Sequence, residues 1–245
     1  MNLNGQIEQK LKILRLTGIL HTLQVRLQQA QESNSGYQDF LMMLLEDEYE
    51  RRQSGRLLKR LKNAGFEEDK TFEGFDFSFN PQIPVKKIKQ LANCAYIENR
   101  ENIFLLGPVG VGKSHIAQAL GHIACRMGHD VLFTKAAGMF RYLNGGRADN
   151  SWDRRIKQYT SVDLLIIDDF GLKPLSPVQS DDFYEVINER YMKRSTIFTG
   201  NRGIEDWNGL FPDPIIANSA LDRIAHHAHQ IIMTGESYRN KGKQK

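Results

Sequence analysis

The chain has 245 residues, of which 40% are hydrophobic and 25% are charged, and these proportions are those of an ordinary globular protein of about one or two domains. No apolar run approaches the ~18 to 20 residues that a membrane span requires, and the opening MNLNGQIEQK lacks the apolar core of a secretory signal, so we expect a cytoplasmic protein without a membrane partner. Cys94 and Cys125 lie in apolar segments without CxxC spacing, which predicts buried thiols in place of a disulfide or a metal site.

The formal net charge of +4 is distributed unevenly along the chain. The last nine residues, SYRNKGKQK, hold four cations and no acid, which equals the whole excess. Six more cations follow the acidic stretch 46–50 without an intervening acid: Arg51, Arg52, Arg56, Lys59, Arg60 and Lys62. On a helix these side chains form a basic patch that suits a phosphate backbone, although a solvated helix face has the same pattern.

The first 65 residues have the hydrophobic spacing of two long helices. The first is marked by one stripe, at steps of 4, 3 and 4 residues, made of Leu16, Leu20, Leu23 and Leu27. The second begins near Phe40 and continues to Leu61, after a turn at 33–36 where the sequence reads SNSG. Two helices bury little surface alone, so we expect this unit to pack on another element or to serve as a recognition arm.

From about residue 86 onward, helical segments alternate with short apolar strands. The runs that read as strands are NIFLLG, DVLFTKA, DLLIIDDF, STIFTGN and HQIIMTG. This alternation predicts an α/β fold whose largely parallel sheet is covered by helices on both faces. The expected organisation is a helical domain over 1–68, a linker over 69–85 whose aromatic residues pack on the next domain, and the α/β domain over 86–245.

The stretch LLGPVGVGKSH has the spacing of a phosphate-binding loop between a strand and a helix. Its glycines allow the backbone to wrap around phosphate oxygens, and N–H groups of the loop and of the first helical turn donate to them. Lys113 neutralises the β- and γ-phosphates, and the Ser114 hydroxyl binds magnesium. We therefore predict a nucleoside triphosphate site with Mg²⁺ formed by Gly107, Pro108, Val109, Gly110, Val111, Gly112, Lys113, Ser114 and His115.

Two carboxylates end the apolar run LLIIDDF. The four apolar residues place Asp168 at the carboxyl end of a buried strand, where ligands collect in open α/β sheets. We assign Asp168 to the magnesium shell and Asp169 to orienting or deprotonating the attacking water. An acidic helix cap or turn is the alternative interpretation.

A polar pair, Thr199 and Asn201, ends the strand in STIFTGN. Asn201 at this place can hold the attacking water or a γ-phosphate oxygen. Asn after Gly is also an ordinary turn residue, and the spacing does not distinguish the two roles.

The order of five motifs resembles that of the AAA+ subgroup that contains DnaC-type helicase loaders and the IstB-like ATP-binding helpers of bacterial insertion-sequence transposition: GPVGVGKSH, DLLIIDDFG, FTGN, ALDRIAHHAH and ESYR. The amino-terminal segments resemble the IstB-like pattern, in LKILRLTGIL, EDEYERRQSGRLLKRLKNAGF and TFEGFDF. The resemblance thus covers nearly the whole chain. It implies an AAA+ ATPase domain preceded by a small helical domain, with ATP as the nucleotide.

The resemblance also implies roles for individual residues. It assigns the phosphate-loop contacts to Lys113 and Ser114. It makes Asp168 the metal ligand, Asp169 the catalytic acid and Asn201 the first sensor. Arg223 in LDRI corresponds to an arginine finger, which acts on nucleotide bound by the neighbouring subunit, so hydrolysis requires a homo-oligomer. Arg239 in ESYR corresponds to a second sensor or a subunit contact.

Three features depart from the family pattern or invite another interpretation. Position 169 is Asp where AAA+ proteins generally carry Glu, and the shorter side chain predicts slow turnover. FTGN replaces the commoner TSN at the first sensor. The histidines of HHAH have no Cys or acid partner nearby in the sequence, so we expect polar packing at a helix end in place of a zinc site.

The implied function is that of an ATPase that assembles on duplex DNA with ATP, selects or remodels a target site and delivers it to a partner transposase. Its DNA contacts would be mainly to phosphates, hence steeply salt-dependent and largely independent of base sequence, with bending of the duplex. The candidate contacts are the cluster that begins at Arg51 and a second set formed by Arg141, Arg147, Arg154, Arg155 and Lys157.

Two other functions are compatible with the same motifs. A replicative helicase loader would use the same ATPase core and an amino-terminal arm that grips the helicase. A nucleotide-gated DNA-coating protein would bind ATP with negligible hydrolysis, in keeping with the short Asp169 side chain. A small-molecule kinase is disfavoured because no acceptor pocket is indicated beyond the phosphate loop.

Overall fold

The computed structural model of the chain describes residues 3–68 and 70–240. Its contacts divide the chain into a first unit over 1–59 and a second unit over 60–245. In the ranges described, no helix is long and apolar enough to cross a membrane.

The first unit contains three helices where the periodicity predicted two. They are α1 (Leu3–Ile13), α2 (Thr17–Glu32) and the greater part of α3 (Tyr37–Ala64). The unexpected break falls at Arg15, whose backbone is left-handed (φ 56°), and the Leu16 N–H donates to the Leu11 carbonyl oxygen at 2.9 Å. No Gly or Pro marks this turn, so the hydrophobic spacing runs across it without a sequence signal.

A small core joins the three helices. It consists of the buried side chains Leu11, Ile19, Leu23 and Leu44. The other members of the predicted stripe are only partly buried and pack against this core: Leu16, Leu20 and Leu27. The stripe therefore lies along α2 and on Leu16, the residue before it, as predicted, although only Leu23 among its leucines is fully buried.

Glu48 on α3 caps the amino end of α2. Glu48 is only 6% exposed. Its Oε2 accepts hydrogen bonds from the backbone N–H groups of Gly18 (2.6 Å) and Ile19 (3.4 Å). Arg52 Nε donates to the other carboxylate oxygen at 2.7 Å. Burial raises the pKa of Glu48, but the hydrogen bonds from Arg52 and the two N–H groups outweigh it, so the pKa lies below its ordinary value.

Replacing Glu48 by Gln is expected to weaken the contact between α2 and α3 by about 1–3 kcal/mol, because it removes a charged acceptor from buried donors. The folded-state pKa is lowered, so the carboxylate stabilises the unit above the unfolded-state pKa, and this stabilisation is lost as pH falls through the folded-state pKa. Amide hydrogen exchange of α2 in the full chain measures both effects. Glu46→Gln, an exposed site on the same helix, is the control; equal protection of α2 in both variants would contradict the cap.

The second unit is built around a parallel sheet with strand order β2-β3-β4-β1-β5. Its strands are β1 (Asn102–Leu106), β2 (Val131–Lys135), β3 (Leu164–Phe170), β4 (Ser195–Gly200) and β5 (Ala228–Ile232). Every neighbouring pair is parallel. The central strands are buried over almost their whole length because helices cover both faces of the sheet, which confirms the predicted fold class.

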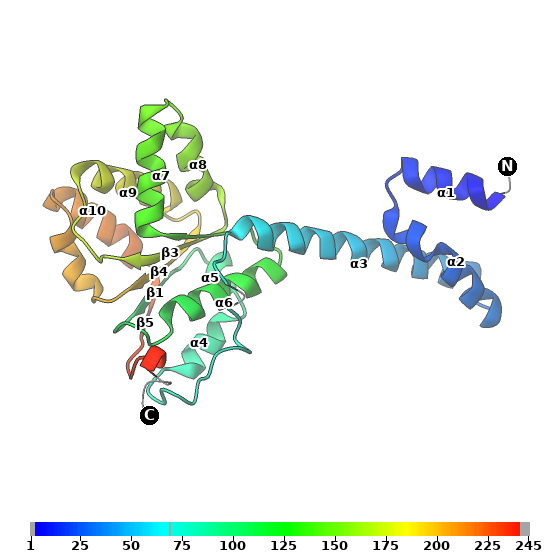
Figure 1. The fold of residues 1–245 in the computed structure, drawn as a ribbon, viewed down its shortest axis with the longest axis horizontal. Coiled ribbons are helices and arrows are strands. Elements are labelled where there is room, and N and C mark those ends of the chain that lie inside the picture. Colours follow the sequence, from blue (N-terminus) through cyan, green and yellow to red (C-terminus); the bar gives the residue numbers. More distant parts are fainter. Residues whose placement is uncertain (1–2, 69, 241–245) are drawn as a thin grey trace. The chain divides into compact units, whose positions relative to one another are not determined.

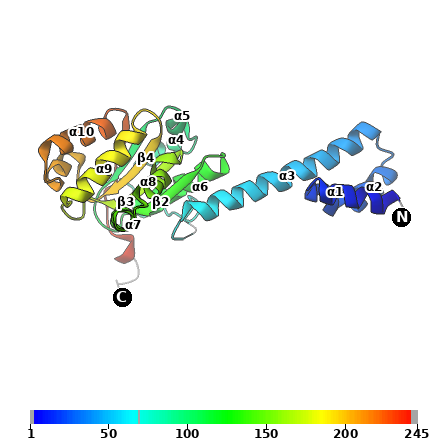
Figure 2. The same ribbon diagram turned by 90° about the horizontal axis from the view of Figure 1, so that it is seen from above.

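Helices cover both faces of this sheet (Figure 1). Helix α6 (Lys113–Arg126) packs on one face of the sheet. On the other face, Phe104 and Leu106 of β1 are buried in a hydrophobic core shared with a second layer of helices. That second layer consists of α7 (Ala136–Ala148), α8 (Trp152–Ser161), α9 (Pro177–Arg190) and α10 (Pro214–Ala225). Figure 2 shows α9 alongside α10, the pair of helices that carries a candidate site residue described below.

Short helices complete the second unit. They are α4 (Val85–Leu91), α5 (Ala95–Glu98), η1 (Ile204–Leu210) and η2 (Tyr238–Asn240). Between β2 and β3 the chain forms two helices, α7 and α8, separated by a turn in which Asn150 is left-handed. Cys94 and Cys125 are both buried free thiols, as predicted, and burial raises the pKa of each to about 11.

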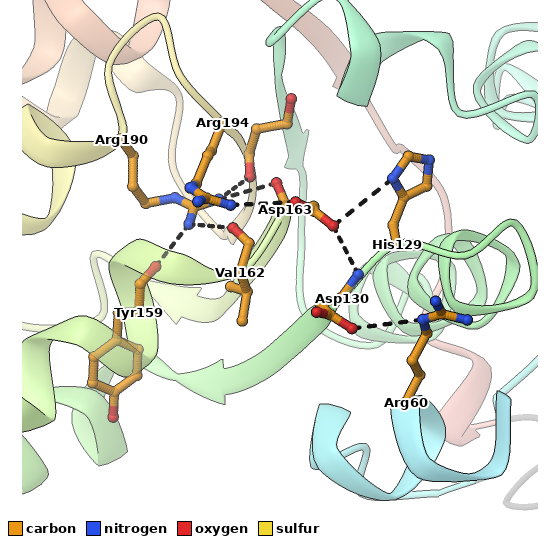
Figure 3. A network of polar contacts seen from close by, with 9 residues as sticks. Arg60, His129, Asp130, Tyr159, Val162, Asp163, Arg190 and Arg194 are labelled. Carbon is orange, nitrogen blue, oxygen red and sulfur yellow. Dashed lines mark hydrogen bonds and ion pairs between the residues drawn. The ribbon is translucent and has the colours of Figure 1, made fainter. Parts of the chain in front are cut away.

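A buried arginine fixes the edge of the sheet at which the strands begin (Figure 3). The Arg190 guanidinium donates to the Tyr159 carbonyl oxygen at the end of α8 (2.7 Å) and to Thr196 Oγ1 in β4 (3.0 Å). Beside it, Arg194 pairs with Asp163 at 3.2 Å, immediately before β3. These contacts tie α8, α9 and the starts of β3 and β4 together, at the edge opposite to the one where β1 enters the predicted phosphate loop.

Candidate nucleotide-binding site

The predicted phosphate loop joins β1 to α6, and its glycines are in close contact with two other segments. Gly112 has φ 99°, and a Cβ added there would lie 2.4 Å from the Phe75 ring. A Cβ on Gly107 (φ 149°) would lie 1.9 Å from the Met233 carbonyl oxygen. Any side chain at these positions would clash, so the loop presents bare backbone, as a cradle for phosphate oxygens requires.

The first turn of α6 supplies a cation and a hydroxyl. Lys113 is only 6% exposed, and its Nζ donates to the carbonyl oxygens of Gly107 (2.8 Å) and Pro108 (2.7 Å). Burial lowers the pKa of Lys113, while the negative charges of the nearby acids raise it. Ser114 Oγ donates to Asp168 Oδ1 at 2.7 Å, which joins the loop directly to β3.

Asp168 lies at the carboxyl end of β3 and is only 2% exposed. Its Oδ1 accepts hydrogen bonds from Ser114 Oγ and from Thr199 Oγ1, the latter in β4. Hydroxyl and carboxylate oxygens are the ligands that Mg²⁺ prefers in proteins. The donor set therefore fits a magnesium ion held by Ser114 and Asp168, the two residues that the sequence indicated.

Asp169 has a strained backbone next to this carboxylate. Its φ of 56° is left-handed, and the pairing of β3 with β4 shifts register between Ile167 and Phe170. The Asp169 N–H donates to Thr199 Oγ1 at 2.9 Å, which holds this conformation. Burial raises the pKa of Asp169, and the charge of Asp168 raises it further. The bulge thus interrupts the alternation of side chains along β3, so that the Asp169 carboxylate lies beside that of Asp168.

Thr199 is the residue whose importance the sequence understated. The family resemblance assigned the sensor role to Asn201 of the polar pair, yet it is the buried Thr199 hydroxyl that bonds to both acidic residues. A threonine within an otherwise apolar, fully buried strand end was the available signal. Asn201 lies one residue beyond β4 and is partly buried, and its sensor role stays a prediction.

Aromatic residues from the segment before α4 line a cavity of about 80 Å³ beside the phosphate loop. Its apolar walls are Phe75, Phe79, Ile83, Val111 and Tyr238. His115 also lines it, and its Nε2 lies 2.7 Å from the Thr71 carbonyl oxygen, which holds this segment to the start of α6. The predicted packing of these aromatics is confirmed, but the cavity that they form was not anticipated.

The segment that follows β5 closes on the phosphate loop from the other side. The Met233 N–H donates to the Leu106 carbonyl oxygen (2.7 Å), and the Tyr238 N–H donates to that of Gly110 (2.9 Å). Arg239 follows Tyr238. Burial and the charges of the nearby acids have the largest effects on the pKa of Lys113, and the positive charge of Arg239 also lowers that pKa. Because the neighbouring Tyr238 is hydrogen-bonded to Gly110, Arg239 lies on the phosphate-loop side of its own chain.

Arg223 lies at the other edge of the sheet, away from the phosphate loop. It precedes Ile224, whose carbonyl oxygen accepts from Asn102 Nδ2 at 3.0 Å. Asn102 begins β1, whereas the loop follows its end at Leu106, and at ~3.3 Å per strand residue the two edges are about 13 Å apart. Among the predicted catalytic residues, Arg223 is thus the one that the fold separates from the rest.

The basic residues predicted on α3 divide into engaged and exposed side chains. Arg51 Nε donates to Thr17 Oγ1 at 2.7 Å, and Arg52 pairs with Glu48. In the second unit, Arg60 pairs with Asp130 at 3.6 Å. Arg51 and Arg52 are exposed despite these contacts, and Arg56, Lys59 and Lys62 are exposed as well.

The second basic set, on α7 and α8, also contains two structural arginines. Arg147 pairs with the fully buried Asp182 at 2.5 Å, and its guanidinium lies 5.2 Å from the centre of the Trp152 ring. Arg155 pairs with Asp149 at 2.6 Å and donates to the Tyr142 carbonyl oxygen. Arg147 is exposed despite its ion pair, and Arg141, Arg154 and Lys157 are exposed as well.

The histidines of HHAH lie at the end of α10 and in β5. His226 and His227 are exposed and their rings are in contact, and His229 Nε2 lies 2.9 Å from Glu101 Oε2. Over residues 3–68 and 70–240, no group of three or more His, Cys, Asp or Glu side chains is arranged to hold a metal ion.

Comparison with known proteins places these motifs in a family. The model of the IstB-like ATP binding protein family matches residues 9–245. A Mycobacterium tuberculosis protein named as ATP-binding in an insertion sequence is 45% identical over 94% of this chain and 92% of its own length. The ATP-binding protein named for insertion sequence IS21 of Pseudomonas aeruginosa is 37% identical over 98% of this chain and 91% of its own length.

Solved structures share the fold at low sequence identity. DnaI has a TM-score of 0.59 at 20% identity, covering 68% of this chain and 92% of that chain. AMPPCP-bound DnaA from Aquifex aeolicus has a TM-score of 0.57 at 21% identity, covering 70% of this chain and 52% of that chain. With its AAA+ fold, its phosphate loop and these relatives, the chain belongs to the family of IstB-like ATP-binding proteins of bacterial insertion sequences.

Proposed function

We propose that this protein hydrolyses ATP at the site formed by the phosphate loop and the two acids that end β3. The observation that carries the proposal is the buried Asp168 carboxylate, which accepts from the Ser114 and Thr199 hydroxyls. When bound there, Mg²⁺ supplies positive charge to the phosphate oxygens. Lys113 neutralises the β- and γ-phosphates. Asp169 takes a proton from the attacking water, whose oxygen bonds to the γ-phosphorus as the bond from that phosphorus to the bridging oxygen breaks, and ADP and phosphate are released.

The aromatic cavity beside Gly112 is the proposed place of the adenine ring. Its walls, among them Phe75 and Tyr238, offer ring faces for stacking next to the loop that holds the phosphates. The segment before α4 and the segment after β5 both line this cavity or contact the loop. Nucleotide binding would therefore order both segments on the ATPase domain.

We propose that Arg223 completes this site on a neighbouring copy. Its place at the far edge of the sheet keeps it from the phosphates of its own chain, whereas a head-to-tail assembly would bring it to the next copy's triphosphate. The γ-phosphate then favours the assembled state, and its loss on hydrolysis favours release. ATP in this scheme acts as the timer of assembly.

Membership in an insertion-sequence family favours a transposition helper over a helicase loader. In this role the protein assembles on duplex DNA, selects or remodels a target, and recruits or activates a transposase. The exposed cations Arg56, Lys59, Arg141 and Arg154 support contacts with DNA phosphates. Specific capture of a ring helicase by the full chain would instead favour the loader, and a single-turnover assay without ATP cleavage would favour a DNA-coating role.

Replacing Arg147 by Ala is expected to lower the free energy of unfolding by about 3 kcal/mol, because it leaves the buried Asp182 carboxylate without its cation. Replacing the exposed Arg154 by Ala should leave unfolding unchanged and weaken DNA binding, with a salt dependence reduced by about one counterion. Thermal unfolding and DNA titrations at several salt concentrations separate the two. Equal effects of both variants on stability would contradict the assignment.

The proposed function is tested by measuring the rate of ATP hydrolysis per subunit against protein concentration, with and without duplex DNA. A site shared between copies predicts that the rate per subunit rises with concentration and rises again when DNA promotes assembly. A rate that stays flat across both series would contradict a shared site. No phosphate release under any of these conditions would contradict the ATPase itself.

A further inference from the structure

The Arg223 side chain is held in place by three neighbouring residues. Its guanidinium carbon lies 5.2 Å from the centre of the Tyr184 ring and 5.9 Å from that of Tyr191. Its Nη1 donates to the Ser219 carbonyl oxygen at 2.9 Å and to the Ser219 hydroxyl. Tyr184 belongs to α9, Tyr191 follows that helix directly, and Ser219 lies one turn earlier in α10. Contacts from two helices thus converge on one guanidinium.

This arrangement leaves part of the guanidinium available to another molecule. The group has N–H donors on Nε, Nη1 and Nη2, and within the described part of the chain the hydrogen bonds engage Nη1 alone. Arg223 itself is partly buried, so one side of the group rests on protein. The unused donors on Nε and Nη2 are the pair that a phosphate can engage in a two-pronged contact.

Holding the guanidinium has a catalytic consequence. A free arginine side chain loses rotamer entropy when it is immobilised. The tyrosine rings hold the guanidinium in place as soon as the protein folds. The entropy is therefore already lost before the guanidinium contacts a triphosphate, and it does not oppose that contact. Each such cation–π contact attracts the guanidinium to the face of the ring.

The surroundings of Arg223 are cationic, which suits a triphosphate. Arg100 and Arg194 lie at the same edge of the sheet and line one hollow with Arg223. Arg194 pairs with Asp163, while Arg100 donates to the Met192 carbonyl oxygen. With Arg190, the lining of this hollow holds four arginines and no acid, so the nucleotide-bearing edge of another copy would be its electrostatic complement.

We propose that Tyr184 and Tyr191 are positioning residues for hydrolysis: they hold the Arg223 guanidinium so that it meets the triphosphate bound by the next copy. The inference rests on the proposed function, in which Arg223 acts between copies. It adds a requirement that Arg223 alone does not carry, namely two aromatic faces on the copy that provides the arginine. A tyrosine pair that merely fills space would be replaceable by any apolar side chain of similar size.

The test compares two double variants of the full chain. Tyr184→Phe with Tyr191→Phe keeps both ring faces and is expected to keep the wild-type kcat. Tyr184→Leu with Tyr191→Leu keeps apolar volume but removes the rings, and should lower kcat about tenfold without changing the affinity for ATP. Tyr142→Leu, which removes the aromatic partner of Arg155, is the matched control and should leave kcat unchanged.

Mixing experiments separate positioning from a folding defect. The leucine variant has an intact phosphate loop, so Lys113→Ala copies, which keep both tyrosines and Arg223, should raise its activity. Arg223→Ala copies should not. A folding defect would give the same result in both mixtures. Wild-type kcat in the leucine variant, with Arg223→Ala inactive, would overturn this inference alone; wild-type kcat in Arg223→Ala would overturn the proposed shared site as well.

Discussion

Asp168→Asn is expected to lower kcat for ATP hydrolysis by about three orders of magnitude, since a metal ion contributes several kcal/mol of charge stabilisation. Asn keeps an Oδ1 acceptor for the Ser114 and Thr199 hydroxyls, so the hydrogen-bonded frame survives and only the charge is removed. The Mg²⁺ concentration for half-maximal activity should rise in parallel. Steady-state rates over a magnesium titration measure both quantities.

The matched control for this change is Asp181→Asn, at an exposed position on α9. It removes the same charge elsewhere in the second unit and should change neither kcat nor the magnesium dependence. Thermal unfolding of both variants confirms that they are folded. An Asp168→Asn protein with kcat within a factor of three of wild type, a margin of under about 1 kcal/mol, would show that this carboxylate does not hold the metal.

Arg223→Ala is expected to lower kcat by about 10³-fold, the lower end of the range for removal of an arginine finger. The affinity of the separate chain for ATP should be unchanged, because Arg223 lies at the edge of the sheet away from its own phosphate loop. Equilibrium binding of a fluorescent ATP analogue at low protein concentration, beside kcat at high concentration, measures the two effects. Loss of ATP affinity in the separate chain would place Arg223 in its own site.

Arg223→Lys distinguishes geometry from charge. Lysine keeps the positive charge but lacks the planar fork that grips two phosphate oxygens and stacks on the Tyr184 and Tyr191 rings. Its kcat should therefore remain close to that of the alanine variant. Recovery of kcat by lysine would mean that charge alone suffices, and that the aromatic contacts serve only packing.

Much of the second unit was predictable because its sequence signals are local. Three motifs predict their structure from a few neighbouring residues: the strand NIFLLG, the glycine spacing after it and the run LLIIDDF. The structure has β1, the phosphate loop and β3 at these positions. Parallel strands buried on both faces need continuous apolar runs, which are the easiest pattern to recognise. Ser114 and Asp168, 54 residues apart, meet because both lie at the carboxyl edge of the same sheet.

The features that sequence reasoning missed depend on tertiary contacts. The turn at Arg15 has no Gly or Pro to mark it and is held by the packing of α1 on α2. Charge alone could not separate Arg147, which pairs with a buried acid, from the exposed Arg154. The cavity near Phe75 is formed by three segments that are distant in the sequence: the segment before α4, the phosphate loop and Tyr238. No local sequence pattern predicts that these segments come together.

The shared site is tested most directly by mixing Arg223→Ala with Lys113→Ala, two variants that are each expected to be inactive. In a random equal mixture, about one interface in four pairs an intact phosphate loop with an intact arginine, so activity should recover to about a quarter of the wild-type rate. Labelled subunits establish that the two variants assemble together. A co-assembled mixture that stays as inactive as its separate components would contradict the claim that one copy completes the active site of the next.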